Sequence, residues 1–391
     1  MDAARYRMNW NYPTSIRVGA GRLLELPEAC RELGMHAPLL VTDPGLASLP
    51  MVEEALAECR AFGLRPDLFC AIRGNPTGQN VTDGVMAYKG GRHDGVIAFG
   101  GGSALDTGKA VALMVGQNRP LWDFEDVGDN YRRVKVDTMA PVVAVPTTAG
   151  TGSEVGRVSV ITDEQAQVKR LIFHPRMMPS IVILDPELSR GLPPKITAAT
   201  GMDALSHCLE AYCSPLFHPM AEGIALEGMR LIREFLPRAV ANGNDMEARL
   251  HMLVASTMGA TAFQRGLGAM HALAHPLGGL FDVHHGTLNA ILMPYVLQAN
   301  RRAIEPALSR LGRYLGLARV DAEGVLEWIL KLREEIGIPH TLADIGLDAS
   351  QAERIAQMAE LDPSAATNPI AFTRAEYRQL FERALRGRQP G

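Results

Sequence analysis

Two stretches of the chain place histidine and aspartate at a spacing that suits metal binding. His271 and His275 stand four residues apart in a run of Ala, Leu and Met, which favours helix. A helix puts two such residues on one face, one turn apart. Asp203 and His207 repeat this spacing in a second run of helix-forming residues. A carboxylate and two or three imidazoles converging from these segments would form a divalent metal site, open to water or substrate because it contains no thiolate.

More histidine follows the first pair. Pro276 and Gly278-Gly279 are expected to end the helix, and the chain then continues to His284 and His285. A lone histidine on an apolar helix is most often a core or capping residue. Two polar pairs in apolar helices are harder to explain in that way, because a buried charge without a partner is costly. Chemistry is therefore the better interpretation of these residues.

The composition is that of a soluble globular protein. The 391 residues are 47% hydrophobic and 21% charged, and a chain of this length is expected to form two domains. A net charge of -4 gives no general attraction to nucleic acid or to an anionic membrane. We find neither a signal peptide nor a membrane-spanning run, and the five cysteines form no Cys-x-x-Cys pair. We expect a cytoplasmic protein with reduced thiols and no nucleic-acid or membrane partner.

The first half of the chain alternates short apolar runs with helical patterns. Residues 5–20 are expected to form an edge strand or hairpin. Further strands are expected at 38–43, 66–69, 95–99, 141–145 and 181–185, a hairpin at 157–173, and helices at 23–33, 47–60, 78–91 and 103–115. This alternation is typical of a parallel sheet covered by helices.

The second half has almost no strand pattern. Prolines and a glycine within 186–194 interrupt both periodicities and indicate a domain boundary. Helices are expected beyond it at 196–212, 219–241, 245–264, 288–299, 303–315, 321–336, 348–359 and 373–386. We therefore predict an α/β domain over residues 1–190 and an all-α domain over residues 191–391.

Two loops that follow predicted strands suit a nucleotide. Residues 100–102 are glycines that lead into a helix, with Ser103 as a candidate N-cap and Asp106 as its capping-box partner. Glycines let the backbone approach a phosphate, which a helix N-terminus favours. The second loop, residues 146–154, offers hydroxyls and amides for ribose, phosphate or carboxamide groups. Each loop could also be a purely structural turn.

Taken in order, these motifs resemble the iron-dependent (group III) alcohol dehydrogenase family over nearly the whole chain. The matching stretches are Val41-Thr-Asp43, Asn75-Pro-Thr77, Gly100 to Asp106, Pro146 to Glu154, Ala199 to His207, and His271 to Gly278 with His285-Gly286. Each stretch is weak alone, whereas the set is highly specific. The resemblance implies a dehydroquinate synthase-like fold, in which a Rossmann-like dinucleotide-binding domain and an all-α metal-binding domain enclose the active site.

The resemblance also assigns roles to residues. The metal ligands would be Asp203, His207, His271 and His285, with His275 near the nicotinamide. Asp43 would accept hydrogen bonds from the ribose hydroxyls and repel a 2′-phosphate, which favours NAD over NADP. The other implied cofactor-binding residues are Asn75, Gly101, Gly102, Ser103, Asp106, Thr147, Thr148, Thr151 and Lys169.

Two features depart from the family pattern. His284 is an additional histidine, and the interval of fourteen residues from His271 favours His285 as the ligand. The segment before His271 is one residue shorter than usual and carries a cation, a form similar to the branch that contains 4-hydroxybutyrate dehydrogenases. Phe263 and Arg265 are therefore candidate substrate residues, with Arg265 for a carboxylate. An exposed helix-end charge is the alternative for Arg265.

The implied reaction is reversible hydride transfer between NAD and a small primary alcohol, such as an ω-hydroxy acid like 4-hydroxybutyrate, to give the aldehyde. The metal, Fe(II) by resemblance with Zn(II) or another divalent ion as alternatives, would act as a Lewis acid, and His275 would pass the proton toward solvent. A homodimer or larger homo-oligomer is expected. The competing interpretations are a hydroxyacid–oxoacid transhydrogenase that keeps its nicotinamide bound and, from another class, a metal-dependent hydrolase that would leave the two loops without purpose.

Overall fold

The computed structural model describes residues 14–166 and 168–387. The chain divides into two compact units at the peptide bond between Gly191 and Leu192. Among the described residues, neither unit contains a helix with the length and apolar character needed to cross a membrane.

The unit that ends at Gly191 is built on a six-stranded parallel sheet. Its strands are β1 (Ser15–Val18), β2 (Pro38–Val41), β3 (Asp67–Phe69), β4 (Gly95–Gly100), β5 (Val142–Pro146) and β8 (Ile181–Leu184). They lie in the order β1-β8-β5-β4-β2-β3, and every neighbouring pair is parallel. The predicted sheet is confirmed. The strand expected within 5–20 is the edge strand β1, and the part of that prediction before residue 14 lies outside the described residues.

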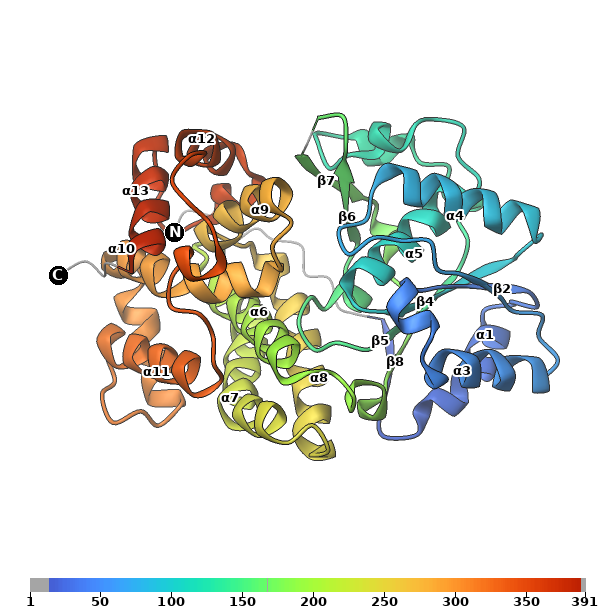
Figure 1. Ribbon diagram of the computed structural model, residues 1–391, viewed down its shortest axis with the longest axis horizontal. Helices are drawn as coiled ribbons and strands as arrows, with labels where there is room; N and C mark the ends of the chain where they lie inside the picture. The colour runs from blue at the N-terminus through green and yellow to red at the C-terminus, as the bar shows by residue number, and fades with distance from the viewer. Residues whose placement is uncertain (1–13, 167, 388–391) are drawn as a thin grey trace. The chain divides into compact units, whose positions relative to one another are not determined.

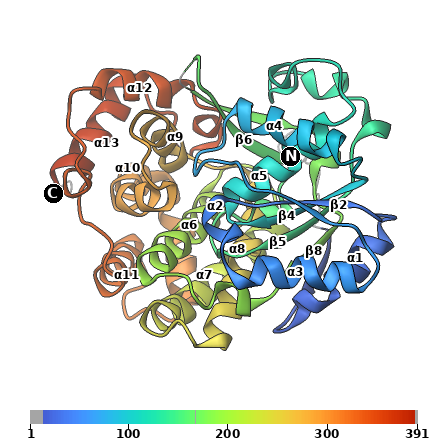
Figure 2. The same ribbon diagram turned by 45° about the vertical axis from the view of Figure 1, so that its right-hand side comes forward.

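Helices cover both faces of this sheet (Figures 1 and 2). They are α1 (Leu26–Glu32), α3 (Pro50–Ala61), α4 (Gly78–Gly90) and α5 (Gly102–Met114). α1 and α3 share one hydrophobic core with Phe99 and Val145 of the strands, and α4 and α5 lie on the opposite face. α5 packs tightly on β4, because a Cβ on Gly108 would come within 2.7 Å of the Cβ of Ala98. The expected hairpin forms separately, as β6 (Val158–Asp163) and β7 (Val168–Phe173).

The winding of the sheet reverses at β2. The chain adds β3 on one side of β2 and then crosses to add β4 on the other. In open α/β sheets, ligands bind outside the carboxyl ends of the strands at such a switch point. Asp43 follows β2 and Gly101 follows β4, so two of the predicted cofactor residues stand at this position.

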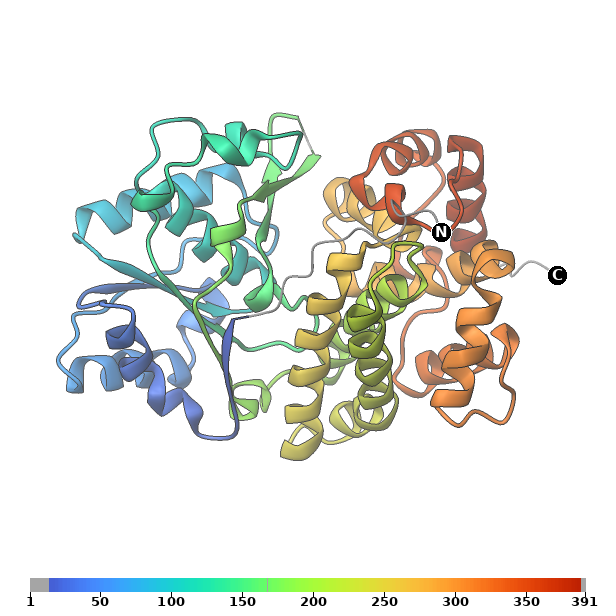
Figure 3. The ribbon, with the colours of Figure 1, turned by 180° about the vertical axis from the view of Figure 1, so that it is seen from behind.

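The unit that begins at Leu192 is helical throughout its described residues. Its α-helices are α6 (Pro194–Cys213), α7 (Pro219–Ala241), α8 (Met246–Ala262), α9 (Ala269–Phe281), α10 (His285–Tyr314), α11 (Ala322–Glu335), α12 (Ala352–Leu361) and α13 (Arg374–Arg386). α6 is buried along most of its length, where α7, α8 and α10 pack against it. α7 and α8 lie side by side, the yellow-green and yellow helices in Figure 3.

Prolines proved weaker helix breakers than the sequence suggested. α9 continues through Pro276 and ends at Phe281, where Asp282 takes the left-handed conformation with φ 53°. Residues 285–314 form one helix rather than two, with Pro294 and Pro306 inside it. An interior proline costs about 3 kcal/mol. Pro276, Leu277 and Pro294 are buried, so tertiary packing offsets that cost here.

A buried lysine fixes α5 to the loop that follows β5. The Lys109 ammonium donates to the carbonyl oxygens of Ser153 (3.0 Å) and Val158, and it lies 3.3 Å from Oδ1 of Asp106. Asp106 also accepts hydrogen bonds from the Ser153 hydroxyl and the amide of Val160. Burial lowers the pKa of Lys109, and the charge of Asp106 opposes that shift. This network holds residues 153–160 against the first turns of α5.

We predict that Lys109→Ala lowers the free energy of unfolding by about 3–5 kcal/mol, because it leaves the Asp106 carboxylate buried without its cation. The measurement is urea-induced unfolding followed by circular dichroism. Arg60→Ala is the control, because it removes the ion pair between Arg60 and Glu53, whose side chains are 51% and 70% exposed, respectively. This substitution should lower the free energy of unfolding by less than about 1 kcal/mol. Equal losses in the two variants would contradict a structural role for the Lys109 network.

Candidate metal centre and nucleotide-binding loops

The predicted metal ligands converge within the helical unit. Asp203 and His207 lie on α6 and His271 on α9, and one ligand atom from each lies within 4.8 Å of the others. His285, the first residue of α10, brings Nε2 to 3.8 Å from Oδ1 of Asp203. The rings of His207 and His271 stack with centroids 4.8 Å apart. One carboxylate and three imidazoles are a donor set that suits a divalent transition metal.

Glycines allow the helices to approach closely at this point. A Cβ on Gly286 would come within 2.2 Å of the Ala199 carbonyl oxygen and 3.1 Å of the Asp203 Cβ. A Cβ on Gly259 would lie 3.1 Å from the carbonyl oxygen of Ala204. The start of α10 and the last turn of α8 therefore reach the α6 backbone only because these positions have no side chain.

The electrostatics keep the Asp203 carboxylate ionised. Burial alone would raise its pKa, but the charges of His207, His285 and His271 and a hydrogen bond from Asn289 hold that pKa well below its usual range. Nδ2 of Asn289 lies 2.9 Å from Oδ1 of Asp203 and 3.1 Å from Nε2 of His285. Asn289 thus joins α10 to α6 at the centre of the cluster.

The two adjacent histidines occupy different surroundings. His285 is part of the cluster, whereas His284 is exposed and precedes the first turn of α10. The structure thus brings His285, the residue favoured by its spacing, beside Asp203.

His275 lies beside the cluster with a carboxylate of its own. Its ring stacks on His285 with centroids 5.5 Å apart, and its Nδ1 lies 2.8 Å from Oδ2 of Asp362. Burial would raise the pKa of Asp362, but the charge and the hydrogen bond of His275 lower it, with further help from Ser364. An ionised Asp362 accepts a hydrogen bond from Nδ1–H of His275, which leaves the lone pair of that imidazole on Nε2.

The two predicted substrate residues are placed very differently. The Phe263 ring meets the His207 ring edge to face at 5.2 Å. Arg265 is only 7% exposed. Its guanidinium donates to the carbonyl oxygens of Ala211 (3.1 Å), Tyr212 (2.7 Å) and Leu216 (2.6 Å) and pairs with Glu222 at 2.8 Å. Arg265 therefore closes the C-terminal end of α6, and neither the predicted carboxylate-binding role nor the exposed alternative describes it.

Three polar residues that the sequence did not single out belong to this site: Glu210, Asn289 and Asp362. Two of them had a local indication, because Glu210 follows His207 by three residues and Asn289 follows His285 by four, on the same helical faces. Asp362 stands 87 residues after His275, and only the fold brings the two together.

In the other unit, the two predicted nucleotide loops pack against each other. A Cβ on Gly102 would come within 2.6 Å of Oγ1 of Thr151, and one on Gly101 would lie 3.5 Å from Thr148. The amide of Thr147 donates to the Gly100 carbonyl oxygen at 3.0 Å. The hydroxyl-rich loop thus lies over the glycine turn at the N-terminus of α5, the position that favours a phosphate.

The expected capping box at this helix is wrong. α5 begins at Gly102, and its N-cap is Gly101, which makes no side-chain cap. The Ser103 hydroxyl donates instead to the carbonyl oxygen of Gly74. Asp106 faces Ser153, Val160 and Lys109, so its carboxylate is part of the network that holds the loops.

Three other predicted cofactor residues lie in the same unit. Asp43 caps α2 (Pro44–Ala47), because its Oδ1 accepts a hydrogen bond from the amide of Leu46 at 3.0 Å. Asn75 and Lys169 are brought together across 94 residues of sequence, with Nζ of Lys169 donating to Oδ1 of Asn75 at 2.9 Å.

One unit has a parallel sheet whose winding reverses beside two loops suited to phosphate, and the other has a carboxylate–imidazole cluster. These features are typical of a metal-dependent oxidoreductase. Comparison with known proteins agrees with this class. The family described as iron-containing alcohol dehydrogenase matches residues 13–186, and the C-terminal part of the Fe-containing alcohol dehydrogenase family matches residues 197–385. The 4-hydroxybutyrate dehydrogenase of Cupriavidus necator is 37% identical over an alignment of 384 residues, which covers 96% of this chain and 99% of that protein.

Solved structures give the same answer. A 1,3-propanediol oxidoreductase is similar with a TM-score of 0.92 and 35% identity, covering 97% of this chain and 100% of that one. The sulfoacetaldehyde reductase of Bifidobacterium kashiwanohense in complex with NAD+ has a TM-score of 0.87 and 29% identity, covering 97% and 99%. The chain belongs to the iron-containing alcohol dehydrogenase family, and it is an oxidoreductase of the alcohol dehydrogenase class, as its sequence motifs predicted.

We predict that Arg265→Ala destabilises the protein by about 1–3 kcal/mol, because buried carbonyl oxygens at the end of α6 lose their donor. It should leave the ratio of kcat/KM for 4-hydroxybutyrate and 1-butanol unchanged. Arg310→Ala is the matched control, since Arg310 also pairs with Glu222 (3.2 Å) but is 55% exposed, and it should cost less than about 1 kcal/mol. A selective loss of activity toward the acid in Arg265→Ala would restore the substrate role.

Proposed function

We propose that this enzyme transfers a hydride reversibly between a small primary alcohol and NAD, with a divalent metal held by Asp203, His207, His271 and His285. In this proposal residues 1–190 bind the nicotinamide cofactor and residues 191–391 hold the metal. The observation that carries it is the convergence of three ligand atoms within 4.8 Å in a buried part of the helical unit. The family name supports Fe(II), and Zn(II) or another divalent ion suits the same donors.

The site residues divide the work of the reaction. One carboxylate and three neutral imidazoles would leave a bound divalent ion with residual positive charge, which supplies the Lewis acidity that makes an alcohol easier to deprotonate. Asp203 would supply the only negative charge among these four ligands. His275, whose Nδ1 is held by Asp362 at 2.8 Å, offers Nε2 as the group that receives the proton. Phe263, beside His207, would form an apolar wall for the carbon chain of the substrate.

The cofactor proposal rests on the unit that contains the sheet. Gly101 and Gly102 at the start of α5 would receive the phosphates, and the Thr147–Thr151 loop would meet the sugar or the carboxamide. Asp43, which follows β2, would accept hydrogen bonds from the ribose hydroxyls and repel a 2′-phosphate. Asn75, Ser103 and Lys169 are kept as cofactor-binding candidates. The NAD+ complex of the related sulfoacetaldehyde reductase supports the choice of NAD.

The substrate proposal rests on likeness rather than on a specific contact. The similarity to the 4-hydroxybutyrate dehydrogenase makes short ω-hydroxy acids candidates beside neutral primary alcohols. We no longer propose Arg265 as the group that binds their carboxylate, because its donors are engaged elsewhere. A homodimer or larger homo-oligomer in the cytoplasm remains our expectation.

The test is a panel of 4-hydroxybutyrate, 1-butanol, 1,3-propanediol and methanol, assayed with NAD and NADP on protein reconstituted with Fe(II) or Zn(II). Metal-dependent NADH formation from a primary alcohol is expected. Hydride exchange between two substrates without turnover of free NAD would identify a transhydrogenase instead. Failure with every alcohol of the panel, with either cofactor and either metal, would reject the proposal.

We predict that His271→Ala loses nearly all bound metal and nearly all turnover while the helical content stays the same, because one of four ligands is removed. Atomic spectroscopy measures the metal content, NADH formation measures the turnover, and circular dichroism measures the helical content. His284→Ala is the control, since it alters the exposed neighbour of His285 and should keep the metal. A His271→Ala protein with a full equivalent of metal would remove His271 from the ligand set.

We predict that Asp43→Asn raises the ratio of kcat/KM with NADP to that with NAD, because it removes the charge that repels a 2′-phosphate. Asparagine can still cap α2, so the fold should be preserved. Asp43→Gly should act in the same direction at a cap cost of only a few tenths of a kcal/mol. An unchanged cofactor ratio in both variants would show that Asp43 does not meet the ribose.

A further inference from the structure

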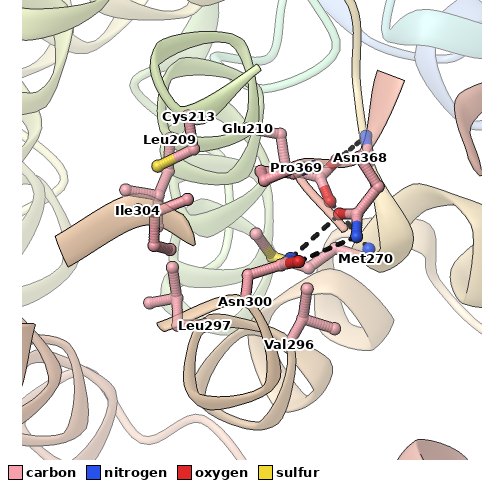
Figure 4. A pocket seen from close by; sticks show the side chains of 11 residues that line it. Leu209, Glu210, Cys213, Met270, Val296, Leu297, Asn300, Ile304, Asn368 and Pro369 are labelled. Carbon is pink, nitrogen blue, oxygen red and sulfur yellow. Dashed lines mark hydrogen bonds between the residues drawn. The ribbon is translucent and has the colours of Figure 1, made fainter. Parts of the chain in front are cut away.

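Glu210 is a buried carboxylate that joins α6 to the first turn of α9. It is 5% exposed. Its Oε2 lies 2.6 Å from Nδ1 of His271 and 2.9 Å from the amide nitrogen of Gly268, and its Oε1 accepts from the amide of Met270 at 2.7 Å. Figure 4 shows this carboxylate at the edge of a small cavity that Asn300 and Asn368 also line.

The Glu210 carboxylate is fully hydrogen-bonded at this position. A buried ionised carboxylate is costly unless it is fully hydrogen-bonded, and these three donors meet that requirement. A Cβ at Gly268 would come within 2.8 Å of Oε1, so glycine there permits the close approach. The first turn of α9 is therefore built around the Glu210 side chain.

We propose that Glu210 is a positioning residue that fixes the tautomer and the orientation of His271 for metal binding. The carboxylate accepts a hydrogen bond from Nδ1–H, which leaves the lone pair on Nε2. Nε2 is the nitrogen on the side of the cluster, 3.2 Å from Nδ2 of Asn289, which in turn lies 2.9 Å from Oδ1 of Asp203. A histidine that binds a metal commonly donates its other N–H to a carboxylate in this way.

Glu210 lies on the same helix as two of the proposed metal ligands. Asp203, His207 and Glu210 follow one another at intervals of four and three residues, so they share one face of the helix. One face of α6 thus supplies two ligands directly and the group that orients a third ligand from α9. The inference rests on the proposed function, since it assumes that His271 binds the metal.

A simple helix cap is the competing explanation, and the chain offers a matched control for it. Asn368 caps the same turn of α9, because its Oδ1 accepts from the amide of Ala269 at 3.0 Å. The other bonds of Asn368 go to Asn300 and Ile370, and none in the described residues goes to His271. Removing Asn368 therefore weakens the helix start without touching the imidazole.

The variant of choice is Glu210→Gln, which keeps the volume beside a cavity of about 10 Å³. A glutamine has one acceptor where the carboxylate has two. If its NH2 faces His271, Nδ1 must accept and the ring proton moves to Nε2, where the metal would bind. If its oxygen faces His271, the NH2 is directed at the amide of Met270, donor against donor. The first orientation removes the lone pair from Nε2, and the second breaks the hydrogen bond from Met270 at the start of the helix that carries His271.

The experiment compares the wild type, Glu210→Gln and Asn368→Ala. Affinity for Co(II) is measured by competition with a chelator, and the visible absorption of bound Co(II) reports the ligand geometry. The thermal unfolding of the metal-free proteins is followed in parallel. We expect Glu210→Gln to bind Co(II) about 10–100-fold more weakly, with an altered spectrum. Asn368→Ala should lower the unfolding temperature but change the affinity less than about threefold.

Wild-type affinity in Glu210→Gln would overturn the inference, and so would an equal loss of affinity in both variants, which would indicate a cap alone. Glu210→Asp provides a second variant if the glutamine protein does not fold. Its shorter side chain cannot keep all three bonds, and an affinity equal to the wild type would again overturn the inference. The proposed function fails separately, if the wild type binds no Co(II) or if His271→Ala binds it normally.

Discussion

The buried carboxylate of Asp203 is the constraint on which the helical unit depends. It is 4% exposed on a helix whose other residues are mostly apolar, and a charge in such surroundings requires partners. The partners come from three other positions: His207 one turn along α6, His285 at the start of α10 and Asn289 one turn further. The contacts of His285 and Asn289 fix where the start of α10 must lie against α6. The same contacts therefore stabilise the buried carboxylate and determine how the helices pack.

Glycine residues allow the helices to approach one another closely enough for these contacts. The start of α10 lies so near α6 that a Cβ at Gly286 would come within 2.2 Å of the Ala199 carbonyl oxygen. The same device appears in the other unit, where Gly102 permits Thr151 to lie over the start of α5. In both cases the glycine stands next to residues that we propose as metal ligands or cofactor contacts. Its role is to bring a polar backbone or side chain close to the site, which no larger residue allows.

The sequence was informative where chemistry depends on short-range spacing. The i, i+4 pairs indicated the cluster, and apolar runs ending in glycine or hydroxyl residues indicated the sheet and its loops. It failed where partners are distant in the chain. Asp362 meets His275 across 87 residues, and nothing local to either residue predicts the pair. The sequence suggested that Arg265 binds the substrate. Only the fold shows that the C-terminal end of α6 lies beside Arg265, whose guanidinium donates to carbonyl oxygens that have no partner within the helix.

Local rules also failed where tertiary packing was stronger. Ser103 and Asp106 have the spacing of a capping box, yet Asp106 is directed into a network with Lys109 and the loop after β5. Pairing Asp106 with the buried Lys109 ammonium stabilises the fold more than a capping hydrogen bond at α5 would. An unpaired buried charge costs several kcal/mol, whereas a lost helix cap costs about 1 kcal/mol. The same comparison explains why Pro276 does not end α9, since the packing of a buried helix outweighs one lost main-chain bond.

The two units thus solve the same physical problem by similar means. In one, the Lys109 ammonium is surrounded by main-chain carbonyl oxygens and a single carboxylate, and it fixes a loop to a helix. In the other, the Glu210 carboxylate is surrounded by main-chain amides and a single imidazole, and it fixes one helix to another. Main-chain groups stabilise a buried charge without competing for protons, so the remaining partner can be a side chain that serves the chemistry. This division explains why Nδ1 of His271 is held while Nε2 remains directed at Asp203 and its neighbours.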